Sequence, residues 1–288
     1  MRVSGFTIIR RGVEFGFPFV ESIRSGLPLV DEFVVAVGDC DDGTYEEVVG
    51  IGSPKLNVFR TTWDPEMKSR GLILSQQTNL ALDRCTGDWC LYLQGDEVLH
   101  EKDLERIRLA MQVNLHRRHV LGLSFRYKHF MGSYHILNAL GYRRQVRIVR
   151  GGVGVRSIGD ACGFGYRGSK LRPPLDWRVR STGAWVYHYG WVKPPPVMGE
   201  KRRAFCRLYN GDQAEENPAT RAEEAAAADR FEYDLAACIP YDGAHPAVML
   251  DRIAAQDWPA PPFQPVPLWR NAAWWKGRLQ KAGLLRAA

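Results

Sequence analysis

Three groups of acidic residues in this sequence have a type and spacing that could do chemistry. Asp96 and Glu97 directly follow an apolar run, Asp160 stands alone in a glycine-rich stretch, and a turn over residues 38–44 holds Asp39, Asp41 and Asp42. Carboxylate oxygens bind hard divalent cations, and a carboxylate can also accept a proton as a general base. Two plainer interpretations stay open. Asp42 could cap a turn or helix, and Asp160 could form an ordinary salt bridge with a nearby arginine.

The first hundred residues predict the elements that would position these groups. Short apolar runs at residues 3–9, 32–37, 56–59 and 89–93 are typical of buried strands, and residues 18–25, 44–49 and 72–83 favour helices. This alternation predicts an α/β fold with a mostly parallel sheet and helices on both faces. Ligands of such sheets gather at the carboxyl ends of the strands. We therefore expect Arg10 and Arg11 to meet residues 38–44 and 94–97 at one edge.

The rest of the chain is predicted to be less regular and to continue the same sheet in a partly antiparallel form. Residues 151–154 (Gly-Gly-Val-Gly) favour a tight hairpin turn, and residues 259–267 contain five prolines. The remaining elements expected are a helix at 101–115, strands at 120–127, 145–149 and 184–189, and helices at 201–209 and 221–235. Residues 268–286 mix Trp and Leu with basic residues, as a helix at a membrane surface would, but docking of a terminal helix on its own domain is the more common outcome.

Basic residues are concentrated in one segment. Residues 116–180 contain 14 Lys and Arg against two acidic residues, a local charge of +12, whereas the rest of the chain carries −5 within the total of +7. Such a segment predicts an anionic ligand, with a solvated basic face as the alternative.

Several classes of protein are disfavoured. With 45% hydrophobic and 25% charged residues, the composition argues against wholesale disorder, and no apolar run approaches the roughly 20 residues of a membrane-spanning helix. The N-terminus has no signal-peptide pattern, and the six cysteines form no Cys-x-x-Cys pair, so we expect a cytoplasmic chain with reduced thiols. Residues 163–170 resemble a phosphate-binding loop, but Ser precedes Lys, whereas that motif ends in Gly-Lys-Ser/Thr. The Gly-x-Ser-x-Gly and His-Glu-x-x-His motifs are absent, which argues against a serine hydrolase or a zinc protease.

The order of motifs resembles the family 2 glycosyltransferases of GT-A fold, and most of all a bacterial subgroup. A first strand ends in Arg10, a second leads into Gly-x-Cys-x-Asp-Gly-Thr at 38–44, a helix carries Asn79, and a further strand ends in Gln-Gly-Asp-Glu at 94–97. The resemblance covers residues 3–100 and extends loosely to residues 188–194. It implies a domain over 1–192, with a nucleotide-sugar half at 1–100 and an acceptor half at 101–192, followed by a helical, Pro- and Trp-rich extension at 193–288.

The resemblance implies a divalent cation, Mn²⁺ or Mg²⁺. Asp96 matches the last acid of the family's Asp-x-Asp metal motif, while Gln94 replaces the first acid and brings no charge. Glu97 is expected to compensate, and His188 stands where a late-strand histidine often completes the metal shell; an unrelated core histidine is the alternative. The nucleotide side of the site is expected to use Arg10, Asp39, Asp42, Asn79, Gln94 and Asp96.

The implied reaction transfers a sugar from a nucleotide-diphosphate sugar to an acceptor hydroxyl with inversion. The cation, with Lys and Arg of the basic segment, is expected to neutralise the leaving diphosphate, and Asp160 is expected to take the acceptor proton. Arg126, Lys128 and Tyr134 are expected to line the acceptor side, for a glycan, lipid-linked or other anionic acceptor in the synthesis of cell-envelope glycans or glycolipids. The tail could then hold the protein on the inner face of the membrane.

Two alternatives belong to other classes. Gln94, which replaces the first acid of the metal motif, favours a module that binds a nucleotide sugar without efficient turnover. The basic, aromatic-rich segment is the argument for nucleic-acid binding, but this leaves the strand-end acids unexplained, because carboxylates repel phosphates.

Overall fold

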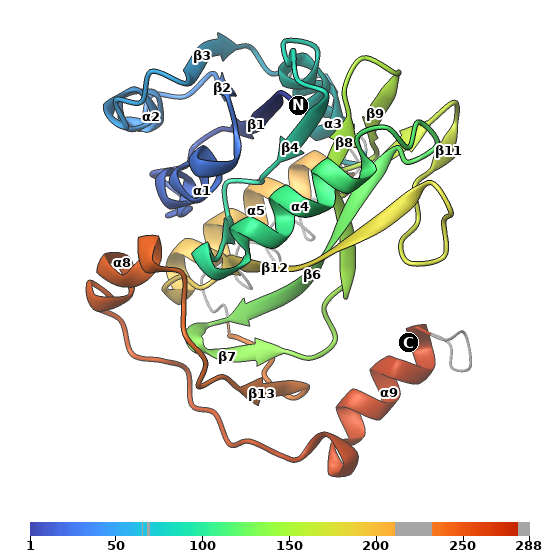
Figure 1. Ribbon diagram of the computed structural model, residues 1–288. Coiled ribbons are helices and arrows are strands. Elements are labelled where there is room, and N and C mark those ends of the chain that lie inside the picture. The colour runs from blue at the N-terminus through green and yellow to red at the C-terminus, as the bar shows by residue number, and fades with distance from the viewer. Residues whose placement is uncertain (65, 68–69, 211–231, 282–288) are drawn as a thin grey trace.

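The computed structural model describes residues 1–64, 66–67, 70–210 and 232–281. The first half of the chain builds four parallel strands in the order β3-β2-β1-β4 (Figure 1). They are β1 (Val3–Ile9), β2 (Glu32–Gly38), β3 (Leu56–Thr61) and β4 (Trp89–Tyr92). The β-branched and aromatic residues of these runs suit a pleated, buried surface, and all four predicted strands are confirmed within three residues at either end.

Within the described part of the chain, the second half extends this sheet with mixed pairing to ten strands. Next to β4 lies β8 (Arg144–Arg150), which is antiparallel to β4 and to β6 (Gly122–Met131). The long strand β12 (Val179–Trp191) then pairs in parallel with β6 and antiparallel with the short β5 (Glu97–Leu99). At the outer edge are β7 (Ser133–Asn138) and β13 (Cys238–Pro240). The prediction of one continuous, partly antiparallel sheet is confirmed.

Helices cover both faces of the sheet, as predicted. On β2, Phe33, Val35 and Val37 join one core cluster, and Val34 and Ala36 join another on the opposite face. The first face is covered by α1 (Phe19–Gly26), α2 (Thr44–Gly50) and α4 (Leu104–Asn114). The second is covered by α3 (Leu72–Leu82) and by a small sheet of β9 (Val155–Ile158), β10 (Gly163–Tyr166) and β11 (Ser169–Lys170).

One prediction of local structure is wrong, and another falls mostly outside the described residues. Residues 151–154 do form a turn, but it connects β8 of the large sheet to β9 of the small one, so the hairpin prediction is wrong. Residues 163–170 form the β10–β11 hairpin. The helix predicted at 221–235 lies mostly outside the described residues.

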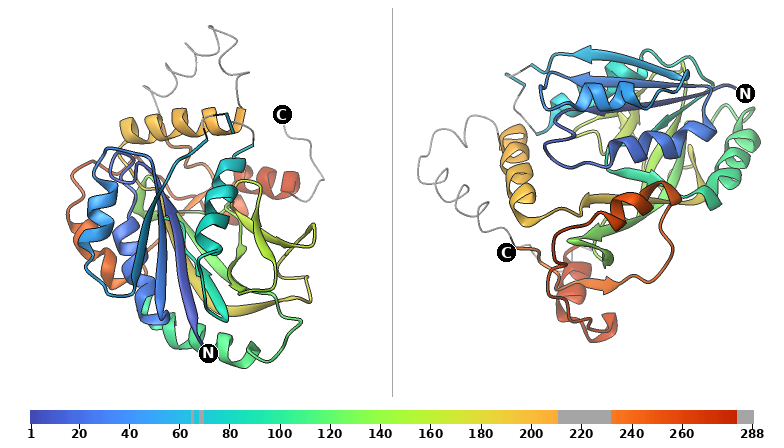
Figure 2. Two further views of the ribbon diagram at one scale, coloured as in Figure 1. Left: turned by 90° about the horizontal axis from the view of Figure 1, so that it is seen from above. Right: turned by 90° about the vertical axis from the view of Figure 1, so that its left-hand side faces the viewer.

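The C-terminal part adds α5 (Pro195–Asn210), α8 (Leu250–Ala254) and α9 (Ala272–Lys281). Seen from above, α5 lies across the carboxyl ends of the parallel strands (Figure 2). Just before α9, Asn271 donates a hydrogen bond of 2.6 Å to the carbonyl of Ala236, which ties the tail to the segment leading into β13. Among the described residues, no helix has the length and apolar character needed to cross a membrane.

Candidate active site

A cavity of about 550 Å³ opens at the carboxyl ends of β1 and β4. Its walls include the end of β1, the segment after β4, the loop between β9 and β10, the end of β12 and one face of α5. The structure thus brings Arg10, Arg11, Gln94 and Asp96 to one edge, as expected from the parallel strands. Its lining from α5 shows that residues beyond 192 help to form this site.

Arg10 forms a cluster with Asp39 and Trp63 at one end of the cavity. The Arg10 Nε atom lies 3.1 Å from Asp39 Oδ1, and the guanidinium carbon lies 5.2 Å from the centre of the Trp63 ring. Asp39 Oδ1 also accepts a hydrogen bond from the Trp63 backbone N–H at 3.2 Å. Gly38 permits this packing, because a Cβ there would overlap the indole. Trp63 escaped prediction from the sequence, although an aromatic residue just after a parallel strand was a signal for it.

Asp42 has a structural role. Its carboxylate accepts hydrogen bonds from the Glu14 N–H at 2.9 Å and from the Thr44 hydroxyl at 2.6 Å. Burial acts to raise the pKa of Asp42, but these hydrogen bonds outweigh it and the pKa is lowered. Asp42 therefore caps the turn that leads into α2, where Gly43 is the N-cap residue, and fixes the loop after β1. It is not in the described lining of the cavity, so the capping interpretation fits this residue better than nucleotide binding.

Asp96 and His188 face each other in the cavity. Asp96 Oδ2 and His188 Nε2 are 3.6 Å apart, and both side chains are nearly buried. Gly190 allows this approach, since a Cβ there would overlap the Asp96 carboxylate. Burial acts to raise the pKa of Asp96, but His188, Lys201 and Lys193 lower it below the ordinary value. Burial lowers the pKa of His188, although Asp96 acts in the opposite direction. A carboxylate therefore faces an imidazole that favours its neutral form.

Glu97 is fully buried. Its two oxygens accept hydrogen bonds from Arg147 at 2.7 and 2.8 Å, and the Tyr127 hydroxyl donates a third at 2.8 Å. Arg147 and Tyr127 engage both Glu97 oxygens, and Glu97 is not in the described lining of the cavity, so these contacts argue against the prediction of Glu97 as a metal ligand. Arg147 also donates to the side-chain oxygen of Gln94 at 3.2 Å.

Two lysines, unforeseen from the sequence, lie near Asp96. Lys201 Nζ on α5 is 3.8 Å from Asp96 Oδ2 and donates to the Gly190 carbonyl at 2.8 Å. Lys193 Nζ donates to the Gly16 carbonyl at 3.0 Å, and its side chain is buried. Burial lowers the pKa of both ammonium groups, and Lys201 adds to this effect at Lys193.

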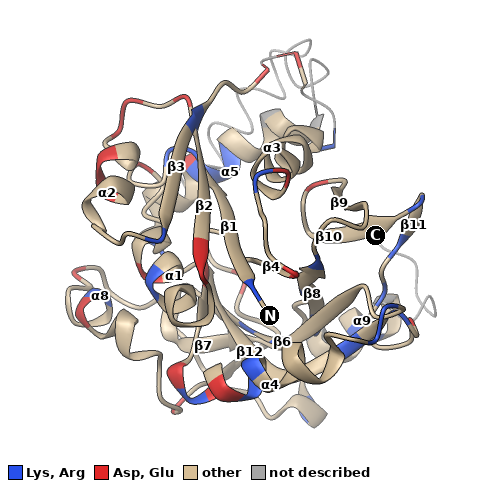
Figure 3. Ribbon diagram, turned by 45° about the horizontal axis from the view of Figure 1, so that its top comes forward, with Lys and Arg blue, Asp and Glu red and all other residues tan. Residues whose placement is uncertain are grey.

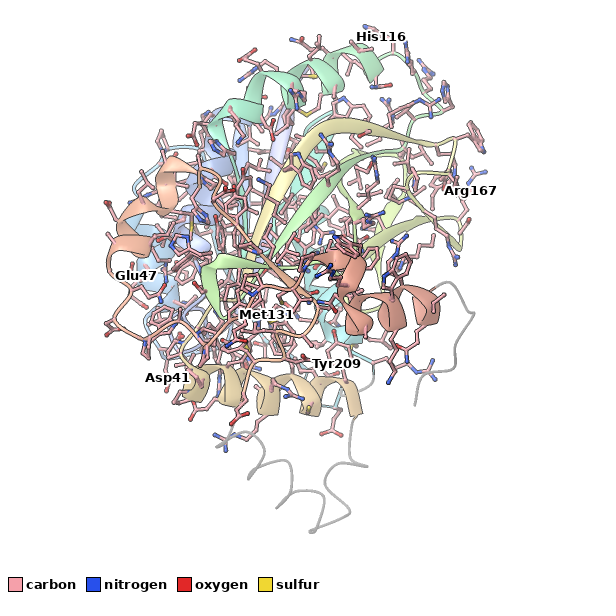
Figure 4. All side chains as sticks on the ribbon, turned by 90° about the horizontal axis from the view of Figure 1, so that it is seen from below. Asp41, Glu47, His116, Met131, Arg167 and Tyr209 are labelled. Atoms are coloured by element: carbon pink, nitrogen blue, oxygen red, sulfur yellow. The ribbon has the colours of Figure 1, made fainter. Side chains whose placement is uncertain are left out.

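Asp160 lines the cavity from the loop between β9 and β10. Its Oδ1 atom accepts a hydrogen bond from the Cys162 N–H at 3.2 Å, and its Oδ2 atom accepts one from the Tyr209 hydroxyl at 3.1 Å. Tyr209, labelled in Figure 4, lies near the C-terminal end of α5. Burial and the Asp160 charge raise the pKa of Tyr209, so its hydroxyl stays a proton donor to the carboxylate.

Five other predicted site residues lie outside the described lining of the cavity, among them Asp39, which contacts the lining residues Arg10 and Trp63. Both ends of the Asn79 amide bond the backbone of Ser157, at 2.9 and 3.1 Å, so Asn79 connects α3 to β9. Arg126 donates to the Gly183 carbonyl at 2.6 Å, and Lys128 donates to the Tyr241 hydroxyl at 2.9 Å. Tyr134 packs in the core cluster that contains Tyr189. The prediction that Arg126, Lys128 and Tyr134 line the acceptor side is therefore not met by this cavity.

The basic segment does not supply the cavity's positive charge either. No Lys or Arg of residues 116–180, all of which the structure describes, is in the lining; the cations are Arg10, Arg11, Lys201 and Arg202. One basic stretch of the segment, at β11, lies on the side of the molecule opposite α2 (Figure 3). Others are used internally, such as Arg150, which donates to the carbonyls of Val120, Leu115 and Asn114.

The donor atoms at Asp96 and His188 fit a divalent cation in part. An oxygen and a neutral imidazole nitrogen 3.6 Å apart can share one ion, with the remaining positions left for ligand oxygens. Within the described part of the chain, no group of three or more His, Cys, Asp or Glu side chains is arranged to hold a metal. A cation here would have two protein ligands and would depend on its substrate for the rest.

Comparisons with known proteins show no matching family model and no matching curated protein. Among solved structures, the chain is similar to residues 1–349 of S. aureus TarS (16% identity, TM-score 0.36), over 71% of this chain and 64% of that one. Mannosyl-3-phosphoglycerate synthase from Rubrobacter xylanophilus matches over 45% of this chain and 41% of that one (19% identity, TM-score 0.32).

A third match is glucosyl-3-phosphoglycerate synthase from Mycobacterium tuberculosis, in a complex with Mn²⁺, UDP and glucosyl-3-phosphoglycerate (17% identity, 44% of each chain, TM-score 0.32). The chain spans less than two thirds of the length of each of these three proteins. At these identities and TM-scores, the likeness assigns no activity to this chain.

Proposed function

We propose that this protein is a family 2-like glycosyltransferase of GT-A fold, which transfers a sugar from a nucleotide-diphosphate sugar to an acceptor hydroxyl with inversion. One observation carries the proposal. A single cavity combines the Arg10–Trp63 pair, the facing Asp96 and His188, an excess of cations, and the carboxylate of Asp160.

The donor would bind through charge and stacking. The planar Arg10 guanidinium, which lies over the buried Trp63 ring at the cavity wall, offers a surface on which a nucleobase can stack. The lining contains two acidic residues, Asp96 and Asp160, and four basic ones. This excess of positive charge favours an anionic ligand such as a diphosphate.

Asp96 and His188 would hold a Mn²⁺ or Mg²⁺ ion together with the diphosphate oxygens. When bound, such an ion neutralises negative charge on a leaving diphosphate. The residues themselves keep an unprotonated oxygen and nitrogen pointed into the cavity, and Gly190 leaves the space between them free of a side chain.

Asp160 would act as the general base. A carboxylate on the acceptor side takes the hydroxyl proton as that oxygen attacks the anomeric carbon, and the attack from the side opposite the leaving group inverts its configuration. The Tyr209 hydroxyl and the Cys162 N–H hold this carboxylate in place. A role in bacterial glycan or glycolipid synthesis, with a glycan or lipid-linked acceptor, remains part of the proposal.

The tail supports a peripheral membrane location on the cytoplasmic face. Trp269 and Trp275 are 67% and 49% exposed, and Arg270 and Arg278 are exposed beside them. Tryptophan with arginine is typical of segments that lie in the interface of an anionic bilayer.

The alternative of binding without turnover is favoured by one specific observation, the engagement of Gln94 and Glu97 by Arg147, which leaves Asp96 as the only carboxylate of the 94–97 motif in the described lining. Thermal unfolding with nucleotide diphosphates and nucleotide sugars, each with and without Mn²⁺, tests the proposal, because a ligand of the native state raises the melting temperature. A Mn²⁺-dependent shift with one nucleotide, lost in Asp96→Ala, and release of that nucleotide from its sugar would support it. Shifts with oligonucleotides alone would overturn it in favour of nucleic-acid binding.

A further inference from the structure

The surroundings of Asp96 contain more positive than negative charge. Lys201 Nζ lies 3.8 Å from the Asp96 carboxylate, and Lys193, which is 1% exposed, packs against the same Phe17 ring as Lys201. Burying an ammonium ion costs free energy unless opposite charge compensates for it. One carboxylate cannot compensate fully for two lysines.

Lys201 keeps unused capacity to bind an anion. An ammonium group has three N–H donors. Within the described residues, Lys201 donates one hydrogen bond, to the Gly190 carbonyl at 2.8 Å, and Asp96 at 3.8 Å lies beyond hydrogen-bonding distance. The rings of Phe17 and Phe205 stand 4.7 and 5.5 Å from Nζ and limit access of water from those sides.

Lys193 lies near Lys201 and is held by a hydrogen bond of its own. Its Nζ donates to the Gly16 carbonyl and lies 4.4 Å from the centre of the same Phe17 ring. Lys201 lines the cavity, whereas Lys193 is not in the described lining. Lys201 can therefore touch a ligand, whereas Lys193 supports it from behind the cavity wall.

We propose that Lys201 binds the diphosphate group of the donor, with Lys193 packed behind it on the same Phe17 ring. The inference rests on the proposed function, and it adds α5 to the donor site. A diphosphate supplies acceptor oxygens and compensating negative charge to the Lys201 ammonium, in the cavity whose lining also holds Asp96 and His188. Part of the donor affinity then persists when no divalent cation is present.

The test compares wild type with Lys201→Met, Lys201→Arg and the control Lys102→Met, which removes one exposed lysine on the other side of β12. Isothermal titration calorimetry in EDTA measures binding of inorganic pyrophosphate, of the nucleoside diphosphate that wild type binds best, and of the matching nucleoside. We expect Lys201→Met to weaken both phosphate ligands by about tenfold or more, a typical loss for one charge-assisted hydrogen bond. Nucleoside binding should be unchanged, and Lys201→Arg should retain most of the affinity.

Thermal unfolding without ligand distinguishes this role from a structural one. Removal of an undercompensated buried charge should leave the melting temperature of Lys201→Met equal to wild type or raise it, whereas loss of a structural ion pair would lower it. Equal pyrophosphate affinity in Lys201→Met and wild type would overturn the inference while the proposed function stands. Binding of pyrophosphate that depends on Lys201, without any nucleotide binding, would support the subsite and overturn the proposed donor. Wild type that binds neither would overturn both.

Discussion

The Nδ1 atoms of His129 and His188 lie 3.1 Å apart, across the parallel pair of β6 and β12, whose register sets the two residues opposite each other. His129 Nε2 lies 2.9 Å from the Tyr142 carbonyl, which can only accept a hydrogen bond. With both rings neutral, His129 carries its proton on Nε2 and accepts at Nδ1, so His188 donates from Nδ1. The free lone pair of His188 Nε2 is then directed toward Asp96, as a metal ligand requires.

His129 is therefore predicted to position His188. We expect His129→Phe, which keeps an aromatic ring beside Tyr142, to weaken Mn²⁺ binding in the presence of nucleotide by about 10- to 100-fold, the usual effect of losing a residue that orients a ligand. Calorimetric titration with Mn²⁺ measures this, and His116→Phe on the exposed surface is the control. Unchanged Mn²⁺ affinity in His129→Phe would argue against the orienting role.

Glu97 is predicted to stabilise the fold. The Arg147–Glu97 pair is fully buried, with N–O distances of 2.7 and 2.8 Å. Breaking such a pair by removing one partner leaves an uncompensated buried charge, so Glu97→Gln should lower the free energy of unfolding by about 3–5 kcal/mol. Urea denaturation measures the change. A loss below about 1 kcal/mol, as expected for an exposed pair, would contradict the buried geometry.

Much of the fold could be predicted from the sequence, because apolar runs and turn residues mark each strand of the parallel half. The strands at 3–9 and 32–37 are recognisable from local composition alone. The short β5 and the small sheet of β9–β11 were missed, since their pairing partners are set by tertiary contacts.

The candidate site was harder to predict, because the register of strand pairing decides which face of the sheet each side chain occupies. Arg126 and Lys128 alternate along β6 with Tyr127 and His129, and the odd-numbered pair contacts Glu97 and His188 near the site. A shift of one residue in this assignment moves every side chain to the other face. Lys201 was missed for another reason. Its helix is distant in sequence from Asp96, and only the folded chain brings them together.

Asp160 is predicted to act in the chemical step and not in donor binding. Asp160→Asn keeps the size of the side chain and its bond to Cys162 but removes the base, so turnover should fall by about 10²- to 10⁴-fold. The dissociation constant for the nucleotide diphosphate should stay within about twofold, because a lost base alters the transition state more than ground-state binding. Assays of sugar transfer and calorimetry give the two values, with the exposed Asp64→Asn as control. Full turnover in Asp160→Asn would require a different base.

His245 is predicted to make stability depend on pH. Burial, together with the neighbouring His135, lowers the pKa of His245 to about 4 from an ordinary value of 6.5. Between these values the unfolded chain takes up a proton that the folded chain does not, so stability falls as the pH drops from 6.5 toward 4. His245→Gln should make the unfolding free energy less dependent on pH across this window, as urea titrations at several pH values would show. His116→Gln is the exposed control, and an unaltered slope in His245→Gln would exclude this source.

The exposed tryptophans of the tail are predicted to contact anionic membranes. Trp269 and Trp275 are 67% and 49% exposed, whereas Trp274 is partly buried and Asn271 bonds to Ala236, so the segment is anchored on one side and offers its rings on another. Interfacial binding combines buried apolar area with attraction of Arg270 and Arg278 to anionic lipids, about 1 kcal/mol for each basic residue near the surface.

The double variant Trp269→Ser/Trp275→Ser should reduce cosedimentation with phosphatidylglycerol vesicles by about tenfold or more. Trp177→Ser is a matched control, because Trp177 is 66% exposed but stacks on His119, outside the tail. Equal cosedimentation of the double variant and wild type would show that the tail does not carry membrane contact, and loss in Trp177→Ser alone would move that contact to the loop before β12.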